Sequence, residues 1–146
     1  MSTVREAKFG DLKDLLELYL FLHETSIPNE DARLKETWEK IMNDPNYHLI
    51  VNEIDGKLVS SCTCLIVPNL THDVHPYAFV ENVVTAEDYR GKGYATQCLD
   101  YARDLAKKEG CYKIMLMTGS KKETTLRFYE NAGYNKESKT AFYQAL

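Results

Sequence analysis

The chain has 146 residues, 44% hydrophobic and 27% charged, which predicts one compact globular domain spanning residues 1–146. Its 18 basic and 22 acidic residues give a formal net charge of -4 with no basic stripe, which argues against a nucleic-acid partner. No apolar run approaches the ~20 residues that cross a bilayer, and neither a signal peptide nor a disulfide framework is evident, so we expect a cytoplasmic protein without a membrane partner.

The first third of the chain predicts a short strand followed by two helices. Residues 4–9 are compatible with β structure and end at Gly10-Asp11. From Asp11, which we expect to be the N-cap, leucines and a tyrosine recur at helical spacing. A second helical stripe occupies residues 34–42 and ends before Pro45.

The middle of the chain predicts three strands. Two of them, at residues 47–54 and 57–67, flank Asp55-Gly56, a dipeptide that suits a tight hairpin. An irregular loop from Pro68 to Pro76 leads to a third strand over residues 77–85. Strict alternation in this strand predicts two faces, one with Ala78, Val80, Asn82 and Val84 and the other with Tyr77, Phe79, Glu81 and Val83.

The last third predicts a long helix, a strand, a short helix and a final strand. The long helix has an apolar stripe that includes Cys98 and ends at Gly110; a β-rich run covers residues 111–118, and a helix covers residues 123–131. We expect a last strand or hairpin from Tyr134 onward. The resulting order, β-α-α-β-β-β-α-β-α-β, predicts a layered α/β sandwich with a partly antiparallel sheet.

The glycine-containing turn between the third strand and the long helix is the strongest chemical signal. It reads Arg90-Gly91-Lys92-Gly93-Tyr94-Ala95-Thr96. Glycine permits close approach to the backbone, and the first amides of the following helix have no intrahelical acceptor. Together with the helix dipole and the basic side chains, these amides predict a phosphate or pyrophosphate site.

Two nucleotide motifs fit this turn poorly. A P-loop needs Ser or Thr after Gly-Lys, where Gly93 stands; a dinucleotide fingerprint needs a third glycine, where Thr96 stands. An acidic residue expected some twenty positions further on is replaced by Lys113. A nucleotide-binding module remains an alternative, which ATP or NAD binding would support.

Three motifs in register resemble the GNAT superfamily of N-acetyltransferases. The Arg-x-x-Gly-x-Ala turn, preceded by residues 81–85, is similar to its acetyl-CoA pyrophosphate loop; residues 126–134 are similar to its tyrosine-bearing helix; and residues 4–7 with Asp11 and Leu12 resemble its first strand and helix. The resemblance implies a GNAT-like sandwich with a mostly antiparallel mixed sheet flanked by helices.

The resemblance also implies where acetyl-CoA binds. The backbone of Val83, Val84 and Thr85 is expected along the pantetheine arm in a strand that is often bulged in the superfamily, with the Val84 amide as the candidate donor to the thioester carbonyl. The expected pyrophosphate ligands are the amides of Arg90, Gly91, Lys92, Gly93, Tyr94, Ala95 and Thr96.

Two side chains are candidates for proton transfer. Tyr129 matches the tyrosine that GNAT enzymes place near the sulfur as general acid, with core packing as the alternative. Glu81 is an unusual charge on a central strand, which favours a base or a group that binds a cationic acceptor over a solvated position. Many members carry asparagine and alanine where this chain has Lys122 and Thr125, which puts the usual side-chain contact to the cofactor in doubt.

The sequence thus predicts an N-acetyltransferase that moves an acetyl group from acetyl-CoA to a primary amine, of a small molecule or a peptide, by direct transfer in a ternary complex. The alternative is a catalytically silent acyl-CoA-binding regulatory module on the same fold. No metal is expected, because Cys62 and Cys64 lack a second pair at zinc spacing and His72 and His75 lie in a loop. The resemblance is compatible with a homodimer.

Overall fold

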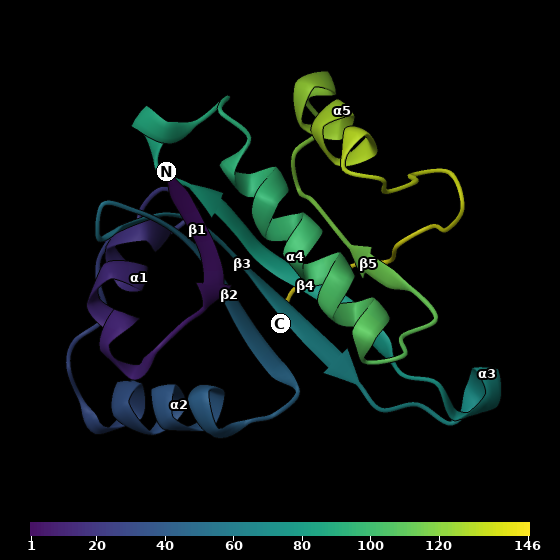
Figure 1. Cartoon of the computed structure of the whole chain (residues 1–146), viewed down its shortest axis with the longest axis horizontal. Helices are drawn as coiled ribbons and strands as arrows, with labels where there is room; N and C mark the ends of the chain where they lie inside the picture. The colour runs from purple at the N-terminus through teal and green to yellow at the C-terminus, as the bar shows by residue number, and fades with distance from the viewer.

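The computed structural model describes residues 1–146 as a five-stranded sheet with helices on both faces (Figure 1). The strands lie side by side in chain order: β1 (Ser2–Glu6), β2 (Tyr47–Ile54), β3 (Lys57–Val67), β4 (Tyr77–Thr85) and β5 (Ile114–Leu116). The first four are mutually antiparallel, and β5 runs parallel to β4. The predicted mixed, mostly antiparallel α/β sandwich is therefore confirmed.

The helices divide between the two faces of the sheet. They are α1 (Leu12–Tyr19), α2 (Ala32–Asn43), α3 (Thr71–Val74), α4 (Tyr94–Lys108) and α5 (Glu123–Asn131), with single 3-10 turns η1 (Phe9–Asp11) and η2 (Glu87–Tyr89). Helix α4 covers one face and buries Cys62, Cys64 and Cys98 beneath it, whereas α1 and α2 cover one end of the other face around Trp38. The three cysteines are fully buried core residues, as their alternating or helical positions suggest.

Strand β4 contains a bulge that the alternating pattern did not predict. Thr63 pairs with Glu81, whereas Ser61, two residues back on β3, pairs with Val84, so β4 carries one extra residue. Asn82 lies in this step with φ of 52°, a left-handed conformation that asparagine tolerates better than most residues. The predicted faces are wrong beyond this point: Val83 packs with the α4 side, and Val84 packs with α1 and α2.

Two other predicted features differ from the structure. Asp11 does not cap α1 with its side chain; its carboxylate instead accepts hydrogen bonds from Arg5 at 2.7 and 3.2 Å and from the Lys8 amide at 2.7 Å. No strand forms from Tyr134 onward, and Phe142 and Tyr143 in this segment are 92% and 83% exposed. A strand needs a neighbour for its backbone groups, and this segment has none within the chain.

Candidate functional site

The turn before α4 presents a row of backbone donors. Gly91 and Gly93 have φ of 73° and 86°, a region that glycine occupies without strain, and α4 begins at Tyr94 without a side-chain cap. None of the amides from Gly91 to Thr96 donates to an acceptor of the protein; the first bond of the helix is Gln97 N to Gly93 O at 3.1 Å. These unsatisfied N–H groups at a helix N-terminus form a ready anion site.

Arg90 departs from the predicted arrangement. Its amide donates to Glu87 O at 3.2 Å, so it is not one of the open donors. Its guanidinium donates to Thr85 O at 3.1 Å and to Phe21 O at 3.3 Å. Arg90 therefore braces the end of β4 and the segment after α1, while the ammonium of Lys92 lies 5.6 Å from the Tyr89 ring centre with no acidic partner.

A fork between β4 and β5 opens next to this turn. The two strands pair only from Ala78–Ile114 to Val80–Leu116, so residues 81–85 of β4 have no partner on that side. On the other side, the Ser60 hydroxyl donates to Val84 O at 2.9 Å and lies 2.9 Å from the Thr85 hydroxyl. Ser60 thus holds the end of β4 against β3, a role that the sequence did not reveal.

Glu81 and Tyr129 approach the fork from opposite faces of the sheet. Glu81 is exposed, and its register with Thr63 and then Leu49 places it on the α1/α2 face. Tyr129, on α5, packs half-buried against the core beneath α4. Burial raises the pKa of the Tyr129 phenol, and the nearby Cys62 and Glu81 raise it further, so the phenol is protonated at neutral pH.

The start of α5 has a local hydrogen-bond network of its own. The Ser120 hydroxyl donates to the Thr125 hydroxyl at 3.1 Å and accepts from the Lys122 amide at 3.3 Å. Thr125 therefore stabilises the turn into α5 through Ser120, and the Lys122 side chain is exposed. Ser120 was not singled out from the sequence, because a serine between lysines and a glycine has no distinctive pattern.

A mostly apolar cavity of about 180 Å³ lies on the α1/α2 face beside the bulge. Asn82 lines it together with side chains that include Tyr19, Trp38, Tyr47 and Leu49. Burial raises the pKa of Tyr19 to about 12, so its hydroxyl is neutral here. No lysine or arginine lines this cavity, which makes it a better match for an apolar group than for a phosphate.

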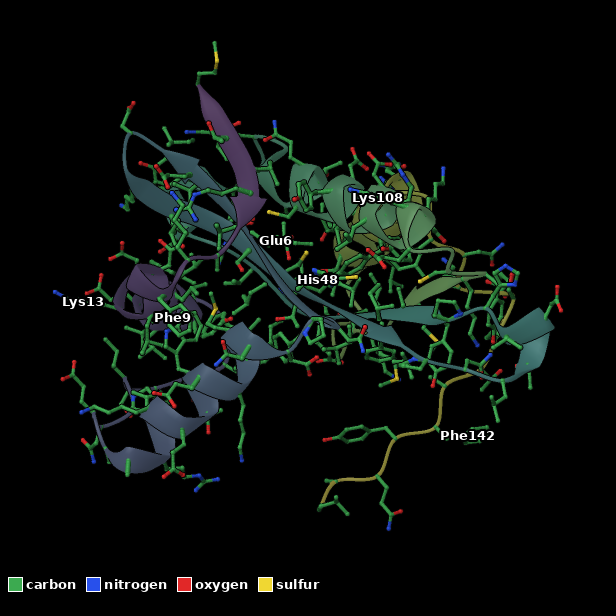
Figure 2. All side chains as sticks on the ribbon, turned by 60° about the horizontal axis from the view of Figure 1, so that its bottom comes forward. Glu6, Phe9, Lys13, His48, Lys108 and Phe142 are labelled. Carbon is green, nitrogen blue, oxygen red and sulfur yellow. The ribbon has the colours of Figure 1, made fainter.

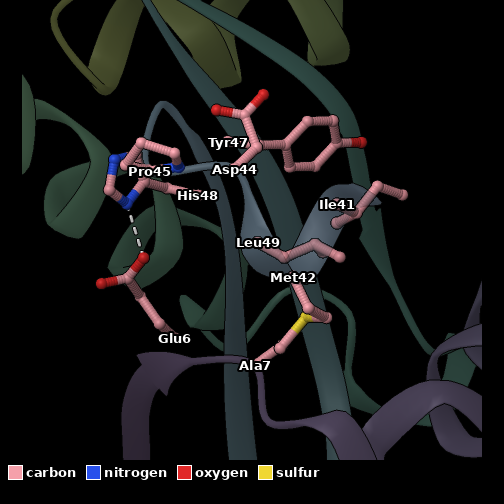
Figure 3. A pocket seen from close by; sticks show the side chains of 9 residues that line it. All are labelled: Glu6, Ala7, Ile41, Met42, Asp44, Pro45, Tyr47, His48 and Leu49. Atoms are coloured by element: carbon pink, nitrogen blue, oxygen red, sulfur yellow. Dashed lines mark hydrogen bonds and ion pairs between the residues drawn. The ribbon is translucent and has the colours of Figure 1, made fainter. Parts of the chain in front are cut away.

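A second hollow, of about 150 Å³, lies between the end of α2 and the ends of β1 and β2 (Figure 3). At its edge the imidazole of His48 and the carboxylate of Glu6 bond each other. The opposite end of β1 contacts the first turn of α4 through Ser2 and Gln97, at 2.9 Å. This hollow is therefore remote from the glycine turn and has no part in the candidate site.

No group of three or more His, Cys, Asp or Glu side chains is arranged to hold a metal ion. None of the helices combines the length and the apolar character needed to traverse a lipid bilayer.

Comparison with known proteins identifies the family. The family model for the acetyltransferase (GNAT) family matches residues 12–134. The chain belongs to the GNAT family of acetyltransferases. Its GNAT fold closely matches a putative acetyltransferase from Agrobacterium tumefaciens, with 38% identity, a TM-score of 0.92 and 99% of both chains covered.

Two further acetyltransferases share less sequence with this chain. An uncharacterized N-acetyltransferase of Methanocaldococcus jannaschii is 25% identical over 92% of this chain, which spans only 61% of that relative's length. The acetyltransferase AAC(6′)-Iy, solved with the bisubstrate analogue CoA-S-monomethyl-acetylneamine, is 18% identical with a TM-score of 0.81 over 100% of this chain and 99% of that one. At this identity the second likeness concerns the fold alone.

Proposed function

We propose that this chain is an acetyl-CoA-dependent N-acetyltransferase that acetylates a primary amine by direct transfer in a ternary complex. The observation that carries the proposal is the row of unsatisfied amides from Gly91 to Thr96 beside the β4–β5 fork, in a chain of the GNAT family. The row supplies an anion site, and the fork leaves residues 81–85 of β4 without a strand partner on the side where the acyl-bearing arm would lie.

In this proposal the backbone binds the cofactor. The open amides of Gly91, Lys92, Gly93, Tyr94, Ala95 and Thr96 hold the pyrophosphate, with the Lys92 ammonium adding positive charge. The pantetheine arm lies in the fork along Val83, Val84 and Thr85. Arg90 acts by bracing the carbonyl of Thr85 rather than by touching phosphate.

The bulge gives the end of β4 a role in the reaction. The extra residue at Asn82 shifts the register of β4 just where the strand leaves β5. Ala86 donates its amide to Val59 O at 2.9 Å, and Val84 pairs with Ser61 two residues before it, so the Val84 amide faces β3 whereas the Thr85 amide faces the fork. We therefore assign the Thr85 amide, and not that of Val84, to the thioester oxygen, where it stabilises negative charge that develops in the transition state. Ser60 holds this segment in place through the Val84 carbonyl.

The two candidate proton carriers fit a transfer that crosses the sheet. Acetyl-CoA lies on the α4 side, and the amine enters from the α1/α2 side, where Glu81 takes a proton from its nitrogen. The nitrogen attacks the thioester carbon, the carbon–sulfur bond breaks, and Tyr129 gives its proton to the departing sulfur. The nitrogen then loses its second proton, which restores the Tyr129 phenol, and Glu81 releases the first proton to solvent. Their positions on opposite faces keep the acid beside the leaving group and the base beside the nucleophile.

The lining of the cavity indicates the chemical class of the amine acceptor but not the individual compound. The space beside Asn82 is apolar and lacks basic side chains, and the exposed carboxylate of Glu81 is next to Asn82 on β4. An amine with an apolar or aromatic body suits this combination better than a phosphorylated amino sugar, whose phosphate would find no cationic partner there.

Calorimetry and a thiol-release assay together test the function. Acetyl-CoA is expected to bind the purified chain, whereas ATP and NAD are not. Thiol release from acetyl-CoA is then measured with a panel of aliphatic and aromatic monoamines, polyamines, amino sugars and lysine peptides. Failure to bind acetyl-CoA would contradict the proposal; binding without release for any amine would favour a regulatory acyl-CoA-binding module.

A further inference from the structure

A buried asparagine lies beneath the first turn of α4. Asn52 is on β2, and its side chain points to the α4 face, as that of Ile50 does two residues earlier. Its amide nitrogen donates to Tyr94 O at 3.3 Å and to Gln97 Oε1 at 2.7 Å. The Ser2 hydroxyl, on β1, donates to the same oxygen of Gln97 at 2.9 Å. The first turn of α4 is therefore tied to two strands of the sheet.

Asparagine is an unfavourable choice for the stability of this position. Asn52 is 0% exposed, and its Oδ1 has no hydrogen-bond partner in the chain. A buried carbonyl oxygen without a donor destabilises a fold, whereas a leucine of similar size would leave no polar atom unsatisfied. Native proteins contain few such atoms, and residues that break local rules concentrate at functional sites. The site next to Asn52 is the row of open amides from Gly91 to Thr96.

The start of α4 needs an anchor on the sheet. The helix begins beside β1 and ends at Lys108 (Figure 2). It has no side-chain cap, and Gly91 and Gly93 precede it, so its own sequence does not fix the first turn. Helix ends of this kind fray, and a frayed turn must become ordered when an anion binds, which weakens binding. Asn52 holds the turn from the carbonyl side and leaves every amide from Gly91 to Thr96 open.

The same row of the sheet reaches the other segment that we assign to the cofactor. Asn52 pairs with Ser60 on β3, and Ser60 pairs with Thr85 on β4, so all three side chains share the α4 face. The Ser60 hydroxyl lies 2.9 Å from the Thr85 hydroxyl and donates to Val84 O. At the start of the turn, Arg90 donates to Thr85 O at 3.1 Å. One row of side chains therefore holds both the turn before α4 and the end of β4.

We propose that Asn52 is a positioning residue for acetyl-CoA, which holds the amides of Gly91 to Thr96 in the orientation that receives the pyrophosphate. The inference rests on the proposed function and adds to it a residue that touches neither the cofactor nor the amine, because Asn52 is fully buried. Asn52 acts through Tyr94 and Gln97, which belong to the first turn of α4. Its effect therefore falls on cofactor binding and not on the proton transfers at the fork.

Calorimetry and urea denaturation of Asn52→Leu test this role. Leucine has a similar size, removes both hydrogen bonds to α4 and also removes the unpartnered oxygen. We expect the dissociation constant for acetyl-CoA to rise about tenfold, the effect of two hydrogen bonds of ordinary net strength. The urea midpoint should not fall, because no buried polar atom is left unsatisfied at this position. A purely structural role predicts the opposite pattern, with a lower urea midpoint and unchanged binding by the folded protein.

A truncated acetyl donor separates the turn from the reacting atoms. S-acetylpantetheine carries the thioester and the pantetheine arm but no pyrophosphate, so it does not reach the turn. In Asn52→Leu, the KM for acetyl-CoA should rise about tenfold with little change in kcat. The kcat/KM for S-acetylpantetheine should stay within about twofold of the wild-type value. An equal loss with both donors would mean that the substitution disturbs the whole site.

Thr63→Val is the matched control. The Thr63 hydroxyl oxygen is also unpartnered and the residue is 2% exposed, but its side chain lies on the α1/α2 face next to Leu49. Removing this oxygen should leave the dissociation constant for acetyl-CoA unchanged. An unchanged dissociation constant in Asn52→Leu, or an equal rise in Thr63→Val, would overturn the role of Asn52. Failure of the wild-type chain to bind acetyl-CoA would instead contradict the proposed function itself.

Discussion

The two ends of the candidate site are built from different material. The turn before α4 offers main-chain amides in a conformation set by Gly91 and Gly93, so its side chains matter little. The fork offers side chains, Glu81 and Tyr129, whose positions depend on strand pairing and on helix packing. Main-chain amides are sufficient to bind a pyrophosphate, which is the same in every turnover. Proton transfer at the reacting atoms needs titratable side chains, which tertiary structure must position.

The largest effect is expected at Glu81. If this carboxylate accepts the proton of the amine, Glu81→Gln should lower kcat by about 10²–10⁴-fold at neutral pH. The defect should shrink as pH rises toward the pKa of the free amine, near 10, because the amine then loses its proton without help. Steady-state kinetics across pH measure both effects. Glu39→Gln, at an exposed position of α2, is the control; a rise in KM alone at every pH would instead make Glu81 a binding group.

The second effect concerns Tyr129 on the other side of the fork. Tyr129→Phe removes the proton offered to the leaving sulfur and should lower kcat by about 10²-fold or more, with the dissociation constant for acetyl-CoA unchanged. Burial raises the pKa of this phenol, so the wild-type rate should show no loss from Tyr129 ionisation up to about pH 9. Tyr112→Phe, a tyrosine stacked on His72 away from the fork, serves as control. Equal rates for Tyr129→Phe and wild type would reduce Tyr129 to a packing residue.

The third prediction concerns Gly93 in the turn before α4, where main-chain amides form the proposed pyrophosphate site. At Gly93 a Cβ would point into open space, where we place the phosphate, and φ is 86°. Gly93→Ala should raise the dissociation constant for acetyl-CoA at least about tenfold, from strain of roughly 1–2 kcal/mol and from the methyl group itself. Gly56→Ala is a close control, since Gly56 has φ of 77°, equal space and a place in the β2–β3 hairpin. If both variants bind acetyl-CoA equally, the turn is not the pyrophosphate site.

The contrast between the two ends also explains what the sequence could predict. Glycine at positions 91 and 93 predicts an unusual backbone conformation, so the turn could be located from the sequence alone. The two faces of β4 could not be predicted correctly, because the bulge inserts one residue with almost no sequence signature. The only indication is Asn82, and the tolerance of asparagine for left-handed φ is a weak signal. As a result Val83 and Val84 were assigned to each other's face.

Features that depend on residues far apart in the chain could also not be predicted from the sequence. A last strand was predicted from Tyr134 onward, but a strand forms only beside another strand, and this segment pairs with none. Asp11 precedes a helix and was predicted to be its N-cap, but the Arg5 guanidinium donates to both oxygens of its carboxylate instead. The order of elements, in contrast, follows from local periodicity and was predicted apart from that last strand.

The bulge itself can be tested at Asn82. Valine disfavours left-handed φ, so Asn82→Val should either straighten β4 or strain it, at about 1–2 kcal/mol. We expect a loss of that size in urea denaturation and a fall in kcat of about tenfold or more, because the bulge sets the register of residues 83–85 beside the fork. Asn82→Gly keeps the conformation accessible and should retain most activity. Unchanged activity and stability in Asn82→Val would show that the bulge does not position the reacting groups.

The smallest effect is expected at Asp11, whose hydrogen bonds go to Arg5 and Lys8 and not to the candidate site. The bidentate bond from Arg5 lowers the pKa of this carboxyl below its ordinary value of 3.8. The pair therefore stabilises the fold above that value, and the contribution disappears as pH falls through the lower, folded-state pKa. Asp11→Asn should thus lose about 1 kcal/mol at pH 7, an amount typical of a partly solvated ion pair, and little in strong acid. Urea denaturation at both pH values measures this difference. Asp14→Asn, an exposed carboxyl on the same helix without a partner, should change stability at neither pH. A constant loss for Asp11→Asn at all pH values would mean that its shape, and not its charge, holds the start of α1 to β1.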